Sequence, residues 1–413
     1  MKAVLKRVMD RFWALPLMCA VAAALLALGV TEVDGSLDTS LRLPFLFAGG
    51  PEGARALLAA IITSMISFTG LVFSITIVVL QLTSSQFSPR VLRTFLEDRF
   101  NQAALGIFVA TFVYGLVVLR AVRGTATANP FVPQFGVTLA FLFVLASVLV
   151  FLAYINHIAQ SIRAATILAT IADDTRRLIE DRFPDDEQQP LPTLPMREGP
   201  ARPVTADRPG VVQWIDDTKL ATLAQRHDVG IELLRAVGEF VPQGVVLALM
   251  HGGDELDGEQ VSAAVHIGRE RSMDQDVGFG LRQLVDIAER ALSPGINDPT
   301  TAVQAVDHLH DILRRLATRK LRPRHSTDDD GRVVVSVPGP TFADYLALAF
   351  DEIQHWGAES PRIQRRVRVA LLDLEGAARP EHRPAVIEAL ARQHQSGTSS
   401  DLDVLAASDT GLR

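Results

Sequence analysis

The chain has 413 residues, is 48% hydrophobic and has a mean hydropathy of +0.22, which is too apolar for an ordinary soluble protein. The net charge of −7, with no basic patch interleaved with aromatic residues, argues against nucleic acid as a partner. A single cysteine, Cys19, excludes an intramolecular disulfide and a thiolate metal cluster. The apolar excess lies before residue 160 and most of the charge after it, so the composition divides the chain in two.

Four stretches in the first part approach the roughly 20 apolar residues that a transmembrane helix needs. They cover about residues 12–31, 56–82, 100–119 and 135–157. The first also resembles a signal peptide, but it is long for one and no clear small-x-small cleavage site follows it. We therefore expect a membrane protein with an α-helical bundle of four transmembrane helices over 1–160, in contact with the lipid bilayer.

Lysine and arginine residues near the ends of these spans predict the orientation. Ten lie at the N-terminus, in the loop 83–102 or after the fourth span, and four lie in the two remaining loops. Cytoplasmic loops carry the excess of such residues, so both ends of the chain are expected in the cytoplasm. The loops 32–53 and 120–134 are then expected outside.

The second span stands out because its uncharged stretch, Ala56 to Pro89, is 34 residues long and carries a regular row of polar and small residues. They recur at alternating steps of four and three, with Ile77 in the one apolar place: Thr63, Ser67, Gly70, Ser74, Gln81, Ser84 and Ser88. At about 100° per residue these positions share one helix face, here called the polar stripe. A helix surrounded only by lipid has no use for such a face, so the stripe is expected to face protein or water.

Two interpretations of the polar stripe stay open. Small and hydroxyl residues let transmembrane helices pack closely, so the first is helix packing. The second is a pore or permeation path, in which hydroxyl groups replace the hydration shell of an ion. The stripe holds no charged residue, so neither a proton relay nor a charged selectivity ring is supported. Because four helices are too few to enclose a wide pore, the second interpretation predicts a homo-oligomer with this helix at its symmetry axis.

The second span is also too long for its membrane. A helix of 34 residues is about 50 Å long, against roughly 30 Å of hydrocarbon. It must either break, with Gly70 as the weak point, or project into the cytoplasm, which the polar residues after Gln81 favour. Ser88 and Pro89 would then cap an amphipathic helix over 90–96 at the membrane surface.

Tyr154, Asn156 and His157 form a polar cluster at the cytoplasmic end of the fourth span. His157 is a candidate pH sensor or ligand. The other interpretation is an interfacial belt that hydrogen-bonds to headgroups or neighbouring helices. Residues 161–210 are expected to form a helical extension of this span, as far as residue 183, followed by a proline-rich linker.

The remainder is expected to be an α+β cytoplasmic domain. Short strands are predicted within a small β-rich module over 211–270. In it, Val237 to Leu247 resembles the turn of biotinyl- and lipoyl-type hammerhead barrels, without the modifiable lysine of a carrier. A helical subdomain follows over 271–395, with one strand at 333–337, and 396–413 is expected to be disordered.

The segment 293–301 joins two of the predicted helices. Its polar residues are Ser293, Asn297, Asp298, Thr300 and Thr301. Asp298 suits an N-cap and Pro299 the first helical position. The segment is either a tight connection whose side chains satisfy buried backbone groups, or a ligand site at a helix N-terminus. Because of the Asp298 carboxylate, a cation or a nucleotide base suits such a site better than an anion.

Signals for metals, cofactors and catalysis are poor. Asp307, His308, His310 and Asp311 are spaced as metal ligands, but a solvated helix face is the commoner use of such a row, so no metal or cofactor is predicted. The sequence has no phosphate-binding glycine loop, no Gly-x-Ser-x-Gly elbow, no Cys–His pair and no zinc spacing. We therefore expect no enzyme, and an enzyme that uses the 293–301 loop is the least favoured hypothesis, because no nucleophile–base pair accompanies the loop.

Three blocks together resemble one family. They are FSITIVVLQLTSSQFSPRVLRTFLEDRFNQ in the second span and its loop, YINHIA at the end of the fourth span, and QDVGFGLRQLVDIAERALSPGINDPTTA around the 293–301 loop. The chain is similar there to the bacterial predicted membrane proteins known as domain of unknown function 2254. The resemblance spans nearly the whole chain and implies an integral inner-membrane protein with a cytoplasmic domain. It implies no activity.

Two functions are predicted from the residues themselves. The first is an oligomeric channel or transport-related protein, whose second span lines the path and whose cytoplasmic domain regulates it. The alternative is a membrane-anchored sensor or scaffold that binds a small ligand or a protein partner and transports nothing. The residues identify neither a permeant ion nor a ligand.

Overall fold

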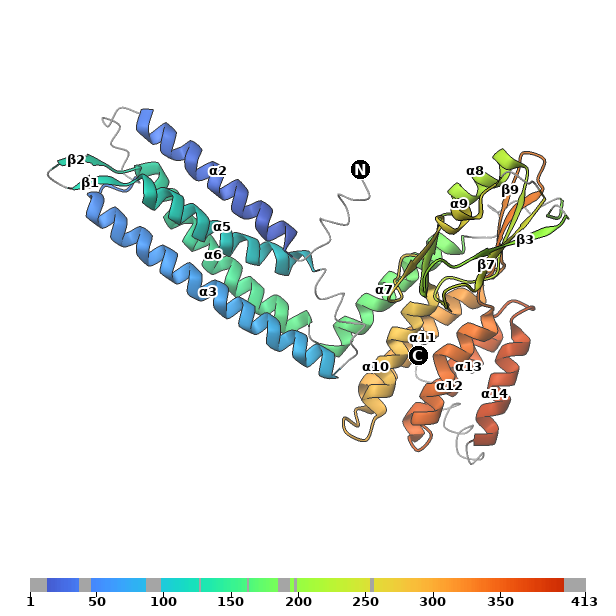
Figure 1. Cartoon of the computed structure of the whole chain (residues 1–413). Coiled ribbons are helices and arrows are strands. Elements are labelled where there is room, and N and C mark those ends of the chain that lie inside the picture. Colours follow the sequence, from blue (N-terminus) through green and yellow to red (C-terminus); the bar gives the residue numbers. More distant parts are fainter. Residues whose placement is uncertain are drawn as a thin grey trace. The chain divides into compact units, whose positions relative to one another are not determined.

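The computed structural model shows two compact units, Met1–Arg163 and Ala164–Arg413 (Figure 1). The residues that the structure describes are 13–36, 46–86, 98–125, 128–161, 163–184, 194–196, 199–252 and 256–396.

The first unit is a bundle of four long helices with a short hairpin (Figure 1). The helices are α2 (Ala14–Ser36), α3 (Pro51–Gln86), α5 (Arg99–Ala121) and α6 (Gln134–Ser161). The hairpin of β1 (Arg123–Thr125) and β2 (Ala128–Phe131) lies between α5 and α6. All four helices are long and apolar enough to cross a membrane, so the four predicted apolar helices are confirmed.

Helix α5 is the centre of this bundle, because it packs against the other three helices and is the most buried of the four. Its side chains Phe108 and Tyr114 are fully buried. Gly106 lets α2 come close, since a Cβ atom at this position would lie 2.9 Å from the Sγ atom of Cys19. Small residues thus allow the helices to approach, as is usual for packing within membranes.

Two polar side chains hold one end of the bundle together. Asp34 in α2 accepts hydrogen bonds from the backbone N–H groups of Phe135 and Gly136 at the start of α6, at 3.2 and 2.9 Å. Arg55 in α3 donates to the carbonyl of Gly124 in β1 at 3.0 Å. Backbone groups at helix ends lack partners within the helix, and these side chains supply them.

Helix α3 runs without a break through Gly70 for 36 residues, which corresponds to about 54 Å. Of the two expected solutions to its length, a break at Gly70 is therefore wrong. A Cβ atom at Gly70 would meet nothing within 4 Å, so this glycine is not required by a close contact within the chain. Ser88, Pro89 and the predicted surface helix 90–96 lie outside the described residues.

The expected extension of the fourth span is wrong. Helix α6 ends at Ser161, and a separate helix, α7 (Ala164–Arg182), begins the second unit. The apolar side of α7, including Leu168 and Ile179, is buried against α10 (Val277–Leu292) and α11 (Pro299–Ala317). This apolar stripe explains why the segment joins the second unit.

The second unit contains two sheets and two short helices, α8 (Asp217–His227) and α9 (Gly258–Ser262). The five-stranded sheet has the order β3 (Ala201–Thr205), β7 (Val246–His251), β5 (Gly230–Leu233), β10 (Val333–Val337) and β9 (Arg324–Thr327). The three-stranded sheet has the order β6 (Phe240–Val241), β4 (Gly210–Ile215) and β8 (Val265–Gly268). Only the β5–β10 pair is parallel among the described strands, and buried apolar residues such as Val212, Leu220, Ile231 and Leu247 fill a common core.

Two domain boundaries need correction. Strand β3 lies within the segment expected to be a linker, and it pairs with β7 through backbone hydrogen bonds. Strands β9 and β10 lie within the segment assigned to the helical subdomain, yet β10 pairs with β5. The β-rich region therefore draws on residues well outside 211–270. The hammerhead-like barrel within it stays a prediction.

The helices of the second unit follow the predicted pattern closely. Besides α10 and α11, they are α12 (Phe342–Trp356), α13 (Pro361–Ala377) and α14 (Arg383–Ser396). Their apolar stripes pack on one another, with α10 against α12 and α11 against α13. The predicted mixture of helices and strands after the four spans is therefore confirmed, and the tail 397–413 lies outside the described residues.

Candidate functional site

The polar stripe of α3 faces away from the other described helices of the first unit. Its described side chains are all exposed: Thr63, Ser67, Gly70, Ser74 and Gln81, together with Ile77. The buried face of the same helix is formed by Leu58, Met65, Val72 and Val79. At about 100° per residue, the two faces lie roughly opposite each other. Within the described part of the first unit, these positions therefore do not pack against another helix.

The exposure of the side chain is not described for two stripe positions. The structure gives no side-chain environment for Ser84, and Ser88 lies outside the described residues. Among the others, the Ser67 hydroxyl donates to the carbonyl of Thr63 at 3.1 Å. Such a bond to the preceding turn partly satisfies a hydroxyl in an apolar environment. The side chain of Gln81 carries two donors and an acceptor, which one such bond does not satisfy.

The buried face of α3 holds a polar contact that sequence reasoning missed. The hydroxyls of Thr76 and Tyr154 lie 2.8 Å apart, and both side chains are buried. A second pair, Thr111 in α5 and Ser147 in α6, is separated by 3.0 Å. Buried polar groups in a helix bundle need such partners. In the sequence, the only signal for the contact between Thr76 and Tyr154 is a threonine within an apolar span and a tyrosine at a similar level in another span.

The structure separates the three residues of the predicted cluster at the end of α6. Tyr154 points into the bundle and bonds to Thr76. His157 contacts the Asp98 carboxylate at 2.5 Å between Nε2 and Oδ2, while Asp98 caps α5 by accepting from the Phe100 N–H at 2.8 Å. Asn156 is exposed and accepts from Gln160 at 3.2 Å. His157 thus belongs to a structural contact between α6 and the start of α5.

The 293–301 loop is organised around Asp298. One carboxylate oxygen accepts from the backbone N–H groups of Thr300 and Thr301, each at 3.1 Å, and the other accepts from the Thr301 hydroxyl at 2.5 Å. The bond from the Thr301 hydroxyl lowers the pKa of Asp298 despite its partial burial, and the two backbone bonds add to this effect. The N-terminus of α11 is thus occupied by the chain's own carboxylate.

The other polar residues of this loop also serve local structure. The Ser293 hydroxyl donates to the carbonyl of Arg290 at 2.7 Å. Asn297 has a φ of 49°, a left-handed conformation that asparagine tolerates better than most residues. The Thr300 hydroxyl accepts from Arg362 of α13 at 3.1 Å. The geometry fits a tight connection between helices and offers no group aimed at a ligand.

The row 307–311 on α11 forms ion pairs with neighbouring helices. Asp311 contacts Arg176 of α7 at 2.6 Å, and His310 contacts Asp373 of α13 at 2.8 Å. Burial raises the pKa of Asp311, but the bonds from Arg176 outweigh it and the pKa is lowered. Burial lowers the pKa of His308, and the nearby Arg176 lowers it further. Across the described residues, no group of three or more His, Cys, Asp or Glu side chains is arranged to hold a metal ion.

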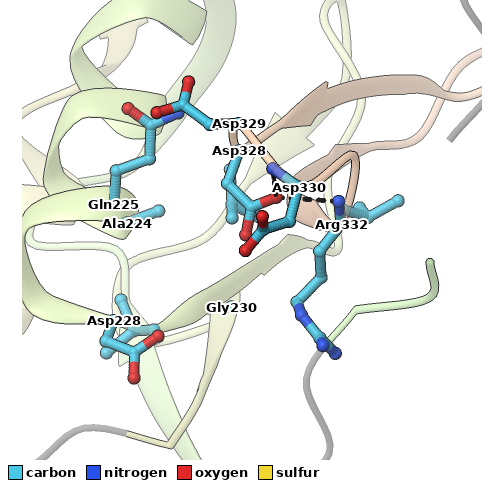
Figure 2. Close-up of a pocket in the computed structure, with 11 residues that line it drawn as sticks. Ala224, Gln225, Asp228, Gly230, Asp328, Asp329, Asp330 and Arg332 are labelled. Atoms are coloured by element: carbon cyan, nitrogen blue, oxygen red, sulfur yellow. Dashed lines mark hydrogen bonds between the residues drawn. The ribbon is translucent and has the colours of Figure 1, made fainter. Parts of the chain in front are cut away.

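A cavity of about 250 Å³ lies beside the turn between β9 and β10 (Figure 2). Asp328, Asp329 and Asp330 form this turn, in which the Asp328 carboxylate accepts from the backbone N–H groups of Asp330 and Arg332 at 3.1 and 2.8 Å. In Figure 2 the carboxylate of Asp228, on the opposite wall, lies apart from the turn. The Asp328 carboxylate therefore serves the turn, and Asp228 does not join the acidic groups there.

A carboxylate pair lies between α10 and α12. Arg282 contacts Asp286 at 2.7 Å and Glu289 at 3.3 Å, and it also pairs with Glu352. Burial raises the pKa of Glu289 to about 7, and the hydrogen bond with the Glu352 carboxyl contributes to this rise. One guanidinium thus faces three carboxyl groups, and the raised pKa lets Glu289 hold a proton near neutral pH.

Comparison with known proteins decides the family. Residues 9–373 match the sequence profile of the predicted membrane proteins called domain of unknown function 2254. The chain belongs to this family. An uncharacterized protein of Mycobacterium tuberculosis (strain H37Rv) and one of Mycobacterium bovis are each 34% identical to it over 385 residues, which is 91% of this chain and 73% of each relative. No solved structure matches the chain significantly.

The family membership confirms the resemblance carried by the three sequence blocks and supports a location in a membrane. The names of these relatives state no activity, substrate or partner. Any function of this member of the family must therefore be argued from its own residues.

Proposed function

We propose that this member of the family is an oligomeric channel or transport-related protein of the bacterial inner membrane. In this proposal the α3 helices of neighbouring protomers turn their polar stripes toward one another and line the path. The second unit lies in the cytoplasm and regulates the path. One observation carries the proposal, namely that the stripe is exposed on the protomer, opposite the face that α3 buries.

The hydroxyl and amide groups of the polar stripe need a surface that offers them hydrogen-bond partners. Toward lipid, hydroxyl and amide groups find no partners outside their own helix, and unsatisfied polar groups are costly there. Toward a second copy, small residues such as Ser67, Gly70 and Ser74 permit close approach and hydrogen bonding between helices. Around a central axis, the same groups face water. A homo-oligomer therefore satisfies the stripe in either geometry, and only a path at the axis gives it a transport function.

The side of the membrane follows from charge. Ten lysine and arginine residues flank the spans on the side of the N-terminus, against four on the other side. This distribution supports cytoplasmic ends and a cytoplasmic second unit. The uncharged stripe supports a path for small neutral or weakly selected solutes better than a charged selectivity ring.

Disulfide crosslinking in the membrane tests the arrangement. With Cys19 replaced by alanine, Ser74→Cys is expected to form crosslinked dimers upon mild oxidation of native membranes. The matched control is Leu71→Cys, because Leu71 is 48% exposed and lies on the same helix about 60° away from Ser74. Equal crosslinking at both positions, or none at Ser74, would contradict an axis lined by the stripe.

Planar-bilayer recordings of the purified protein test transport itself. Conductance is expected, and it should fall strongly for Ser67→Leu and Ser74→Leu but not for Leu71→Ile. A protein that crosslinks through the stripe yet conducts nothing would retain the oligomer and eliminate the channel.

The alternative is a membrane-anchored sensor or scaffold whose stripes only hold copies together. The observation in its favour is the hydrogen bond of Ser67 to its own helix, which leaves that hydroxyl with less need for water. Crosslinking without conductance, combined with a ligand that stabilises the second unit in the intact protein, is the result expected for this function.

A further inference from the structure

A small cavity of about 50 Å³ in the second unit is surrounded by arginine side chains from separate segments. Arg182 is the last residue of α7, Arg322 precedes β9, and Arg324 begins it. The remaining wall includes Asp276, Gly339 and Tyr345. Three arginine residues line so small a space, and their positive charges are unfavourable there unless negative charge balances them.

The acidic groups nearby, within the described part of the chain, do not supply enough negative charge. Arg324 pairs with Asp217, and Arg182 reaches the same carboxylate oxygen only at 3.9 Å. The other carboxylate oxygen of Asp217 is buried without a hydrogen bond within the described part of the chain. Two arginines therefore share one carboxylate, with Arg322 in addition. The carboxylate of Asp181 also acts on Arg182, but its residue is exposed to solvent.

The acid in the cavity wall is already neutralised. Asp276 receives two hydrogen bonds from Arg271, at 2.8 and 2.9 Å, and one from the backbone N–H of Phe279 at 3.0 Å. Its charge and acceptor sites are thus occupied by Arg271 and by the start of α10. Among the residues that the structure describes, the cavity keeps an excess of positive charge.

Arg182 is the decisive group. Its side chain is only 17% exposed, and its Nη2 atom is buried with no hydrogen-bond partner among the described residues. Burial, together with the neighbouring Arg324, lowers the pKa of Arg182 to about 10. The group remains charged at neutral pH, so it is a largely buried cation with one unused donor atom. Such a group is unfavourable unless an anion completes it.

We propose that this cavity binds an oxyanion of the phosphate class, with Arg182 as the buried anchor and Arg322 at the solvent-exposed rim. The planar guanidinium donates paired N–H groups that match phosphate oxygens. A phosphate presents more acceptor oxygens and more charge than a carboxylate, which suits donors that arrive from three side chains. The phosphate group could come from a soluble phosphorylated compound or from a lipid headgroup.

Thermal unfolding of the full-length protein in detergent tests this site without any measurement of transport. Inorganic phosphate, added at constant ionic strength against chloride, is expected to raise Tm in a saturable way. Arg182→Gln should abolish this rise. Arg322→Gln, which changes an exposed side chain and should not impair folding, is expected to weaken the apparent affinity roughly tenfold. The control is Arg269→Gln, an exposed arginine of the same unit that does not line the cavity.

A second titration distinguishes the two sources. Dihexanoyl phosphatidic acid, used below its micellar concentration, replaces phosphate in the same four proteins. A rise in Tm with the lipid at much lower concentration than with phosphate identifies a headgroup site, and the reverse identifies a soluble ligand. The proposal is overturned if neither compound raises Tm. It is also overturned if Arg322→Gln, like the control Arg269→Gln, responds as the unchanged protein does. Conductance plays no part in the result, so the channel and the oxyanion site can fail separately.

Discussion

The two units treat polar side chains in opposite ways. In the first unit they are rare and each buried hydroxyl pair lies between two helices, as in Thr76 with Tyr154 and Thr111 with Ser147. In the second unit charged side chains are abundant and most of those on α10 and α11 are paired across helices. The informative residues are therefore the exceptions in each unit. They are the exposed stripe of α3 in the first and the buried Arg182 in the second.

The largest loss of stability is expected where the packing of α7 against α10 leaves no space for a side chain. A Cβ atom at Gly280 of α10 would lie 2.0 Å from the Thr175 hydroxyl of α7. Because Thr175 is fully buried, Gly280→Ala should push α7 from α10 and destabilise this unit by about 1–3 kcal/mol. Thermal unfolding of the purified protein measures the loss.

Two further variants make this prediction specific. Thr175→Ala removes the clashing hydroxyl, so it should partly rescue Gly280→Ala. Gly376→Ala in α13 is the control, because a Cβ atom there meets nothing within 4 Å and alanine favours a helix. If Gly280→Ala proved as harmless as Gly376→Ala, α7 would not belong to the second unit.

A smaller effect is expected from the buried pair of the first unit. Thr76→Val keeps the shape of the side chain and removes the partner of the Tyr154 hydroxyl. Hydrogen bonds between helices in a bilayer contribute modestly, so the free energy of unfolding should fall by roughly 0.5–2 kcal/mol. Unfolding by sodium dodecyl sulfate in mixed micelles, with Tyr154→Phe and the double variant, measures the coupling.

Ser67→Ala is the matched control, since Ser67 lies on the exposed side of the same helix and bonds only to its own backbone. It should leave the unfolding of the protomer unchanged. An additive double variant of Thr76 and Tyr154 would show that the two hydroxyls do not interact.

The sequence predicts the helices and strands themselves better than it predicts which of them pack or pair together. The four spans and α10 to α14 were found because long apolar runs and apolar residues at helical spacing are local signals. The strand Val333–Val337 was also found, but its partner β5 lies about 100 residues earlier, so its sheet was not. Strand β3 was taken for a linker because ARPVT is short and contains a proline.

The candidate sites show the same limit. The period of the stripe could be read from the sequence, but the side of α3 that meets α5 depends on how the helices pack. Asp298 was predicted as a cap from its position before Pro299, and it is one. Arg182 carries no signal in the sequence, because the groups that act on its charge, Asp217, Arg324 and Tyr345, are distant in the chain.

The carboxylate pair of the second unit predicts a pH effect on stability. The pKa of Glu289 is raised from its ordinary value to about 7, so the folded protein holds this proton more tightly than the unfolded chain does. Between pH 4.5 and 7 the unfolded chain therefore binds fewer protons, and stability falls as the pH rises through this window. Glu289→Gln mimics the protonated form. It should be more stable than the unchanged protein at pH 8, by on the order of 1 kcal/mol, and no more stable at pH 4.5.

Melting temperatures from pH 4.5 to 8 measure this difference. Glu352→Gln should lower the pKa of Glu289, because the Glu352 carboxyl contributes to raising it, so the fall in stability between pH 4.5 and 7 should become smaller. The control is Glu388→Gln on the exposed side of α14. A difference between Glu289→Gln and the unchanged protein that grew toward low pH would reverse the sign and refute the raised pKa of Glu289.

The smallest expected change in the stability of the protomer is that of a substitution in the polar stripe, and it tests most directly the contrast between the two units. Ser74 is exposed, so Ser74→Leu should change the free energy of unfolding of the protomer by no more than about 0.5 kcal/mol. The same variant should reduce the oligomeric fraction in nanodiscs, as counted by native mass spectrometry, because a leucine blocks close approach of the stripes. A loss of protomer stability would mean that the stripe packs within its own chain after all. Loss of the oligomer with an unchanged protomer would place the function of these polar residues between copies of the chain.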